Sequence, residues 1–127
     1  MESMTAFPSK NLVDALRIIE SAARDNAERS VEIEARARRM REQLIAGEGL
    51  VDLVQSEARP RMVELISSNM IALETAGARF RAAQALALRG EGLTIEAIAG
   101  LFGVTRQRIS ALLRQKAAAE ASPSGSK

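Results

Sequence analysis

The sequence predicts an all-α protein. Aromatic residues make up only 2% of the 127 residues although hydrophobic residues make up 46%, so Ala and Leu must supply most of the buried surface. Both are strong helix formers, whereas strands favour β-branched and aromatic residues. No Gly or Pro interrupts residues 11–46, a run that would form about 54 Å of helix at 1.5 Å per residue. The length allows one core or two compact helical units.

Several classes of chemistry are excluded by composition. His and Cys are absent, which excludes zinc fingers, disulfides, thiol nucleophiles and hydrolases that need a His base. Paired carboxylates such as Glu28 and Glu32 lie in an Arg-rich helical run, where a solvated charged face is the simpler interpretation. No phosphate-binding glycine loop occurs. We therefore expect no enzymatic activity, no metal and no cofactor.

The sequence gives no sign of membrane targeting. Met1–Met4 contains an acid and no apolar segment, unlike a secretory signal. No run of 18 apolar residues occurs. We expect a cytoplasmic protein without a membrane partner.

The N-terminal part is expected to contain a loose arm and a long helix. Residues 1–10 lack periodicity and include Pro8. From residue 11 onwards, mostly apolar residues recur at alternating spacings of four and three, which is typical of a helix facing another helix. These positions are Leu12, Leu16, Ile19, Ala23, Asn26, Ser30, Ile33, Ala37, Met40 and Leu44.

Asn26 interrupts this apolar stripe, and two interpretations are open. A buried Asn at such a position fixes the register of helix pairing at some cost in stability. Alternatively, Asn26 faces solvent and the helix bends or breaks nearby.

A second helical stretch follows a short link. Gly47–Gly49 is expected to end the first helix. A short apolar helix is expected over residues 50–58, and Pro60 then marks a kink or the first turn of a helix that runs towards Leu88, with a possible bend at Gly77. This order predicts a helical hairpin or coiled-coil region. Because one hairpin covers only one face of each helix, we expect residues 11–77 to form a homodimer.

The tetrapeptide Gly-Glu-Gly-Leu occurs at residues 47–50 and again at 90–93. It is either the trace of a duplication or one turn chemistry used twice. The residues after the two copies differ, which favours the second interpretation.

Charge is distributed unevenly. Residues 1–77 contain 10 Lys and Arg against 13 Asp and Glu, a net charge of −3, whereas residues 78–118 contain seven against two, a net charge of +5. A basic C-terminal third indicates a polyanionic partner. The alternative is that these arginines only solvate a helix surface.

Residues 93–116 carry the most specific pattern. Thr94 and Thr105 are good N-caps for two short helices, and Gly103 between them tolerates positive φ. The small Ala99 allows a close helix crossing, and Val104 is expected to fill the corner. The expected core of this motif is Ile98, Ala99, Phe102, Gly103, Val104, Ile109 and Leu112.

This pattern resembles the helix-turn-helix motif of bacterial regulators. The similarity is greatest to the three-helix forms at the C-termini of DNA invertases and resolvases and in sigma-factor promoter-reading regions. The resemblance implies a three-helix DNA-binding domain over residues 78–118, in which residues 79–88 supply the first helix. The sequence ends in Ser-Pro-Ser-Gly-Ser-Lys, a composition that predicts a disordered tail over residues 119–127. Residues 1–77 resemble no family that we recognise.

The resemblance also implies which side chains contact DNA. The N-terminal part of the second motif helix would enter the major groove, where Arg can bond guanine and Gln can bond adenine in bidentate fashion. The expected base contacts are Arg106, Gln107, Ser110 and Ala111. The expected phosphate contacts are Thr94, Thr105, Arg108, Arg114, Lys116, Arg79 and Arg81.

These features predict a sequence-specific transcriptional regulator of bacterial type. It would act at the nucleoid as a homodimer and read an inverted repeat in double-stranded DNA through the helix 105–116. Two alternatives remain: a helical adaptor that docks onto RNA polymerase or another protein, and an accessory DNA-binding protein of a phage or mobile element.

Overall fold

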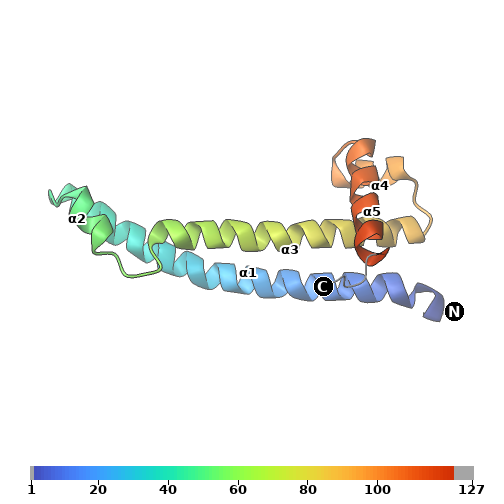
Figure 1. Cartoon of the computed structure of the whole chain (residues 1–127), viewed down its shortest axis with the longest axis horizontal. Helices are drawn as coiled ribbons and strands as arrows, with labels where there is room; N and C mark the ends of the chain where they lie inside the picture. Colours follow the sequence, from blue (N-terminus) through green and yellow to red (C-terminus); the bar gives the residue numbers. More distant parts are fainter. Residues whose placement is uncertain (1, 122–127) are drawn as a thin grey trace. The chain divides into compact units, whose positions relative to one another are not determined.

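The computed structural model describes the backbone of residues 2–121 and the side chains of residues 10–115, and all of its regular structure is helical. Five helices follow one another in this part of the chain, and no strand occurs in it (Figure 1). They are α1 (Glu2–Ile45), α2 (Leu50–Gln55), α3 (Met62–Gly90), α4 (Ile95–Phe102) and α5 (Arg106–Ala121). The predicted all-α class is confirmed.

Both ends of the helical part differ from expectation. α1 begins at Glu2, so residues 2–10 are helical rather than a loose arm. Pro8 removes one main-chain donor, but helix formers such as Met4, Ala6 and Lys10 flank it. At the other end, residues 119–121 belong to α5, and the remainder of the predicted tail lies outside the described residues.

The chain divides into two compact units. The terminal unit comprises Met1–Ile19 and Ala76–Lys127, and the central unit comprises Glu20–Thr75. α1 and α3 each contribute residues to both units. Residues 11–19, which we expected to group with 20–77, therefore belong with the C-terminal helices.

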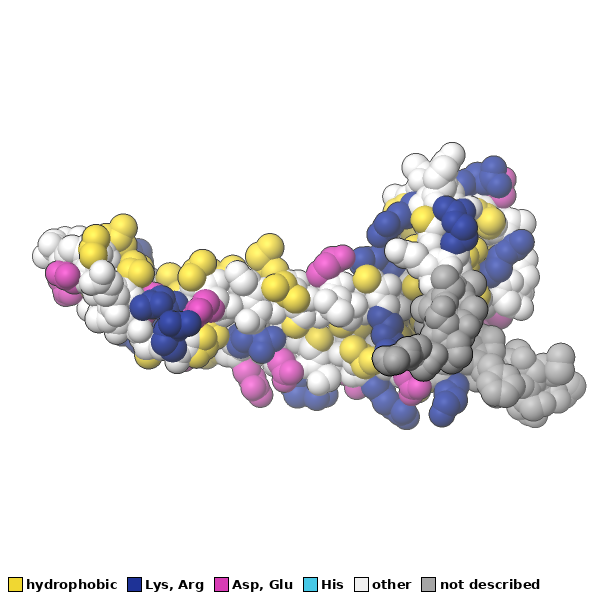
Figure 2. Space-filling model, in the orientation of Figure 1, with side chains coloured by type: hydrophobic (Ala, Val, Ile, Leu, Met, Phe, Trp, Pro, Cys, Tyr) yellow, Lys and Arg dark blue, Asp and Glu magenta, His cyan; other side chains and the backbone are white. Residues whose placement is uncertain are grey.

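The central unit has little buried apolar surface. Leu53 and Leu65 are its buried hydrophobic residues, whereas many of its large apolar side chains are exposed (Figure 2). The exposed set comprises Val31, Leu44, Ile45, Leu50, Val51, Val54, Val63, Ile66, Met70, Ile71 and Leu73. Apolar burial within this unit alone is therefore a weak source of stability.

A polar cluster joins α1 to α3 in the central unit. Asn26 Nδ2 donates to the main-chain oxygen of Asn69 at 3.0 Å, and Asn69 Nδ2 donates to the main-chain oxygen of Asn26 at 3.3 Å. Asn69 Nδ2 also donates to Ser30 Oγ at 3.1 Å. Arg29 donates from Nε to Asn69 Oδ1 at 2.7 Å and from Nη2 to Asn26 Oδ1 at 3.0 Å. Of the two interpretations of Asn26, the structure supports the one in which it joins two helices.

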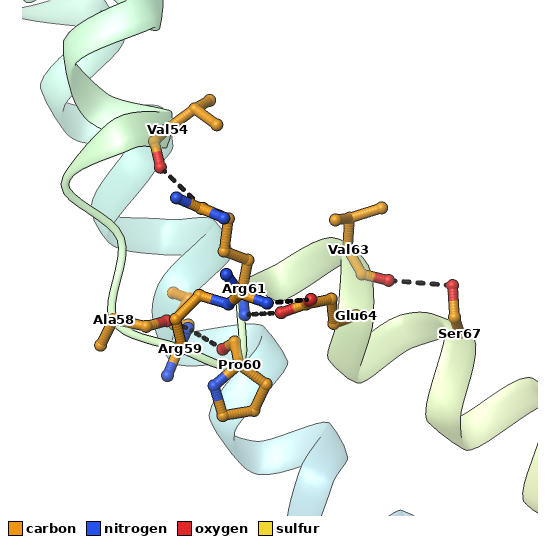
Figure 3. Close-up of polar contacts among 9 residues, drawn as sticks. Val54, Ala58, Arg59, Pro60, Arg61, Val63, Glu64 and Ser67 are labelled. Carbon is orange, nitrogen blue, oxygen red and sulfur yellow. Dashed lines mark hydrogen bonds and ion pairs between the residues drawn. The ribbon is translucent and has the colours of Figure 1, made fainter.

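A second set of polar contacts fixes the link between α2 and α3 (Figure 3). Arg36 Nη1 donates to the main-chain oxygens of Ala58 at 3.0 Å and Pro60 at 2.7 Å, while its Nε donates to Glu32 Oε2 at 2.7 Å. The side chain of Arg36 is only 13% exposed. The hydrogen bond from this guanidinium lowers the pKa of Glu32 below its ordinary value.

The start of α3 is capped by its own carboxylate. Glu64 Oε1 accepts from the main-chain N–H of Arg61 at 2.6 Å, and Glu64 Oε2 accepts from Arg59 Nη2 at 3.0 Å. The first of these bonds is the main reason why the pKa of Glu64 lies below its ordinary value. Arg61 Nε in turn donates to the main-chain oxygen of Val54 at 3.1 Å, which ties the helix start back to α2.

The two Gly-Glu-Gly-Leu segments end their helices differently. In the first, Gly47 has φ +98° and follows α1, and Gly49 is the N-cap of α2 with φ −77°. In the second, Gly90 is the last residue of α3 and Gly92 has φ +102°. The first glycine is left-handed in segment 47–50 and the second glycine in segment 90–93, so the same tetrapeptide forms two different turns.

The core of the terminal unit is built from α3, α4 and α5. Its buried cluster contains Ala85 from α3, Ile98 and Ala99 from α4, and Ile109 and Leu112 from α5. Ala82, Leu88, Leu93, Ile95, Phe102 and Leu113 pack around it. Ala83 and Ala87 of α3 are also buried, and Phe80 and Leu86 are half-buried. Because Ala occurs on every side of this helix, periodicity alone does not identify its packed face.

Candidate nucleic-acid interface

α4, the turn at Gly103 and α5 form a compact pair of helices. Thr94 Oγ1 accepts from the main-chain N–H of Ala97 at 3.1 Å, and Thr105 Oγ1 accepts from that of Arg108 at 3.1 Å. Both predicted N-caps are confirmed. Gly103 adopts φ +70°, a left-handed conformation that costs a residue with a Cβ about 1–2 kcal/mol.

The buried side chains beneath this pair agree largely with prediction. Ile98 and Ile109 are the largest fully buried side chains among the described residues. Ala99 and Leu112 are buried beside them, and Phe102 packs against the cluster. The small side chain of Ala99 is therefore enclosed in the core that α4 shares with α5.

Val104 does not fill the corner between the helices and is 41% exposed. Its main-chain N–H donates to the carbonyl oxygen of Ala99 at 3.1 Å, as does that of Gly103. The backbone of Val104 therefore completes the end of α4, which directs its side chain outward. The core is closed by Phe102 and Leu113 instead.

The outer face of α5 is accessible over its first turns. Arg106, Gln107 and Arg114 are exposed, and Ser110 and Ala111 are half-buried. Arg106, Gln107, Ser110 and Arg114 line one shallow depression of about 300 Å³. Three of the four predicted base-contacting residues thus share one concave surface with Arg114, and Ala111 lies beside it in sequence.

Arg106 has an acidic neighbour that sequence reasoning missed. Its Nε lies 3.4 Å from Glu96 Oε2 on α4, and both side chains are more than half exposed. Glu96 lies in the first turn of α4, where a carboxylate suits the helix dipole. Ten residues and a turn separate the pair, so no local helical spacing could have indicated it.

The predicted phosphate-contacting residues have varied surroundings. Arg79 and Arg108 are exposed, and Arg81 is half-buried. The oxygens of Thr94 and Thr105 accept cap bonds, which leaves each hydroxyl hydrogen able to donate to an anion. The side chain of Lys116 lies outside the described residues.

Arg89, which was not proposed for the site, supports the turn before α4. Its Nη1 donates to the main-chain oxygen of Leu93 at 3.0 Å. This bond ties the last turn of α3 to the residue before the Thr94 cap. Arg89 therefore helps to position α4 without belonging to the outer face of α5.

A second concavity lies in the central unit. It has a volume of about 310 Å³ and polar walls that include Glu32, Arg36, Arg39 and Glu57. No group of three or more potential metal-binding side chains occurs among the described residues. None of the helices in the described part of the chain has the length and apolar character needed to cross a membrane.

Comparisons of the chain with known protein families, with curated proteins and with solved structures find no match.

Proposed function

We propose that the chain is a sequence-specific DNA-binding transcriptional regulator of the helix-turn-helix type. In this proposal α3, α4 and α5 form the three-helix domain, and α5 lies in the major groove. The observation that carries the proposal is the division of α5 into two faces. Ile109 and Leu112 are buried in the core, while Arg106, Gln107, Ser110 and Arg114 line an open depression.

The chemistry of this depression suits base edges. A guanidinium can donate two parallel hydrogen bonds to guanine O6 and N7, and a Gln amide can bond adenine N6 and N7. Arg106 and Gln107 lie in the first turn of α5, the part of a recognition helix that contacts bases. We assign base readout to Arg106, Gln107 and Ser110, with Ala111 available to a thymine methyl group.

Affinity would come mainly from phosphate contacts. Residues 78–118 carry a net charge of +5, and neutralising phosphates releases counterions, so binding should weaken steeply with salt. Arg108 and Arg114 are exposed candidates for these contacts. Lys116, Arg79, Arg81 and the Thr94 and Thr105 hydroxyls complete the proposed set.

We further propose that the protein acts as a homodimer through residues within 11–77. Two-fold symmetry would present one α5 from each chain to an inverted repeat, with the two helices about 34 Å apart in successive major grooves. The exposed apolar side chains of the central unit support the presence of a second copy.

Selection of bound sites from random duplex DNA tests this proposal, followed by anisotropy titrations of the selected site at two salt concentrations. We expect Arg106→Ala to reduce discrimination between the selected site and a scrambled duplex, and Arg108→Ala to weaken binding to both. Arg38→Ala, which removes an arginine of the central unit, is the control and should change neither. The proposal fails if no sequence is enriched and the wild type does not bind duplex DNA at low salt.

A helical adaptor is the second candidate function, because α2 and the end of α1 expose apolar side chains. Ile45, Leu50 and Val51 are each more than half exposed, and such groups favour protein–protein contact. A partner such as RNA polymerase could bind there. An adaptor would capture a protein and show no salt-dependent binding to DNA.

A further inference from the structure

One arginine of α5 has its charge matched by an acid of the same unit. Arg106 Nε lies 3.4 Å from Glu96 Oε2, and the two side chains are 61% and 65% exposed. Arg108 and Arg114, the other arginines of α5, have no acidic partner among the described side chains. The arginine with an acidic partner is thus the one that the proposed function assigns to a base, and the two without one are assigned to phosphates.

The fold of the terminal unit brings this pair together. Glu96 is the second residue of α4, and Arg106 is the first residue of α5. Each helix follows a threonine whose hydroxyl oxygen accepts a main-chain N–H of the first turn. Ile98 of α4 and Ile109 of α5 are fully buried in one cluster. The ion pair therefore connects the starts of two capped helices that share a core.

The position of Glu96 leaves one edge of the Arg106 guanidinium available. A guanidinium has five N–H donors, one on Nε and two on each Nη atom. Glu96 lies beside Nε, and no hydrogen bond of Nη1 or Nη2 occurs among the described residues. Two guanidinium nitrogens can donate in parallel to guanine O6 and N7. Arg106 can therefore contact guanine through its Nη atoms while Nε stays beside the carboxylate.

A phosphate is a less suitable acceptor for this guanidinium than guanine is. The edge of guanine has no net charge, whereas a phosphate carries a full negative charge. A phosphate bound to Arg106 would be separated from the Glu96 carboxylate by little more than the guanidinium itself, so the two anions would repel each other. The Debye length is about 8 Å at physiological ionic strength, so salt screens this repulsion only in part. Glu96 therefore disfavours a phosphate contact of Arg106 more than a guanine contact.

We propose that Glu96 determines specificity by acting through Arg106: its carboxylate disfavours phosphate contacts of the guanidinium and leaves the Nη atoms to guanine. The inference rests on the proposed function and extends it, because it adds a residue of α4 to base discrimination and names the base that Arg106 reads. Non-specific binding consists mainly of phosphate contacts. Glu96 should therefore weaken binding to every duplex, and weaken it most where Arg106 has no guanine to contact.

Anisotropy titrations of the full-length chain provide the first test, with the selected duplex and a scrambled duplex of the same length. The ratio of the two dissociation constants measures discrimination. Glu96→Gln should strengthen binding to both duplexes and lower discrimination about threefold, a size that fits an exposed ion pair. Glu91→Gln is the matched control, because Glu91 is exposed in the turn after α3 and has no ion pair among the described residues. This variant changes the net charge equally and should leave discrimination unchanged.

The second test asks whether Glu96 acts through Arg106. In an Arg106→Ala background the guanidinium is absent, so Glu96→Gln should leave discrimination unchanged, whereas an effect of the carboxylate on DNA alone would persist. Selection of sites with each single variant identifies the base. Arg106→Ala should lose a preference for guanine at one position of the site, and Glu96→Gln should weaken the preference at that same position. Circular dichroism shows whether all variants keep their helix content.

Three results would overturn this inference and leave the proposed function intact, provided that the wild type binds its selected site specifically. The first is equal discrimination by Glu96→Gln and Glu91→Gln. The second is a loss of discrimination on Glu96→Gln that persists in the Arg106→Ala background. The third is a base other than guanine at the position that depends on Arg106. A wild type that binds no duplex DNA at low salt would refute the proposed function, and this inference with it.

Discussion

Asn26 and Asn69 each donate a side-chain N–H to the main-chain carbonyl oxygen of the other, at 3.0 and 3.3 Å. This reciprocal contact joins α1 to α3 in the central unit, where few apolar side chains are buried. A shift of one helix along the other would break both bonds and the one that Arg29 Nε donates to Asn69 Oδ1. The polar cluster thus sets the register of the two helices, a role that buried Asn also has in coiled coils.

Replacing Asn69 by Ala should lower the free energy of unfolding by about 1–3 kcal/mol. The change removes the acceptor of Arg29 Nε and the donor to Ser30 Oγ, and it leaves partly buried polar groups unpaired. Urea denaturation followed by circular dichroism measures the loss. Ser68→Ala, at the exposed neighbouring position, is the control and should stay within about 0.5 kcal/mol of the wild type. Equal effects of the two changes would contradict the assigned role.

The same substitution at two glycines three residues apart should have opposite effects on stability. Gly103→Ala should destabilise by about 1–2 kcal/mol, because Gly103 has φ +70°. Gly100→Ala should stabilise by about 0.5–1 kcal/mol, because Gly100 lies within α4 in a conformation that suits Ala. Apart from the neighbouring residues and the local helix backbone, no atom lies within 4 Å of an added Cβ at either position, so backbone conformation separates the two. Thermal melts of both variants provide the comparison, and a shift of the same sign would refute it.

Removing the charge of Glu64 should make stability less dependent on pH in the acid range. The pKa of Glu64 is lowered from 4.5 in the folded chain, chiefly by the N–H of Arg61. A lowered pKa stabilises the folded state above the ordinary pKa, and this contribution is lost as pH falls through the folded value. Glu64→Gln should therefore destabilise at pH 7 and have little effect near pH 3. Urea midpoints at the two pH values test this.

Glu42→Gln is the control for that experiment. It neutralises an exposed glutamate of α1 without touching the cap of α3. A pH dependence of the same size in both variants would show that general charge, rather than the cap, is responsible.

Neutralising Glu96 should increase affinity for DNA if the proposed function is correct. Glu96 lies 3.4 Å from Arg106, so its carboxylate competes with DNA for the guanidinium and repels phosphates. Glu96→Gln should strengthen binding several-fold at low salt, with a smaller gain at high salt. Glu91→Gln changes the charge of the same segment by the same amount without this ion pair. Anisotropy titrations should show the larger effect for Glu96→Gln. Equal effects of the two variants would show that the Glu96–Arg106 ion pair has no particular influence on DNA affinity.

Local sequence signals predicted the ends of the helices well. Thr94, Gly103 and Thr105 form the expected caps and turn because capping depends on residues within four positions of one another. The predicted start of the first helix was wrong by nine residues, because α1 begins at Glu2 and not at residue 11. Pro8 favours irregular structure locally, but the helix formers on both sides of it outweigh this effect.

Contacts between distant segments could not be predicted in the same way. Asn26 drew attention as an exception in an apolar stripe, but nothing near Asn69 identifies it as the partner 43 residues away. The same holds for Arg36, which the sequence shows only as one of several arginines in the α1 run, and whose guanidinium bonds the link between α2 and α3. In the candidate interface, Ile109 and Leu112 are buried and Arg106, Gln107 and Arg114 are exposed, as predicted. Ser110 and Ala111 are half-buried, and Val104, which precedes α5, is exposed.

The choice of main-chain oxygens as acceptors for Arg36 has a consequence for how this protein can vary. Every amino acid presents the same carbonyl group, so a substitution at position 58 retains the acceptor that the guanidinium requires. The course of the link between α2 and α3 therefore depends on the side chain of Arg36 in α1 rather than on the side chains of the link itself. Mutational drift should be tolerated at residue 58 and resisted at residue 36, although only the former belongs to a loop.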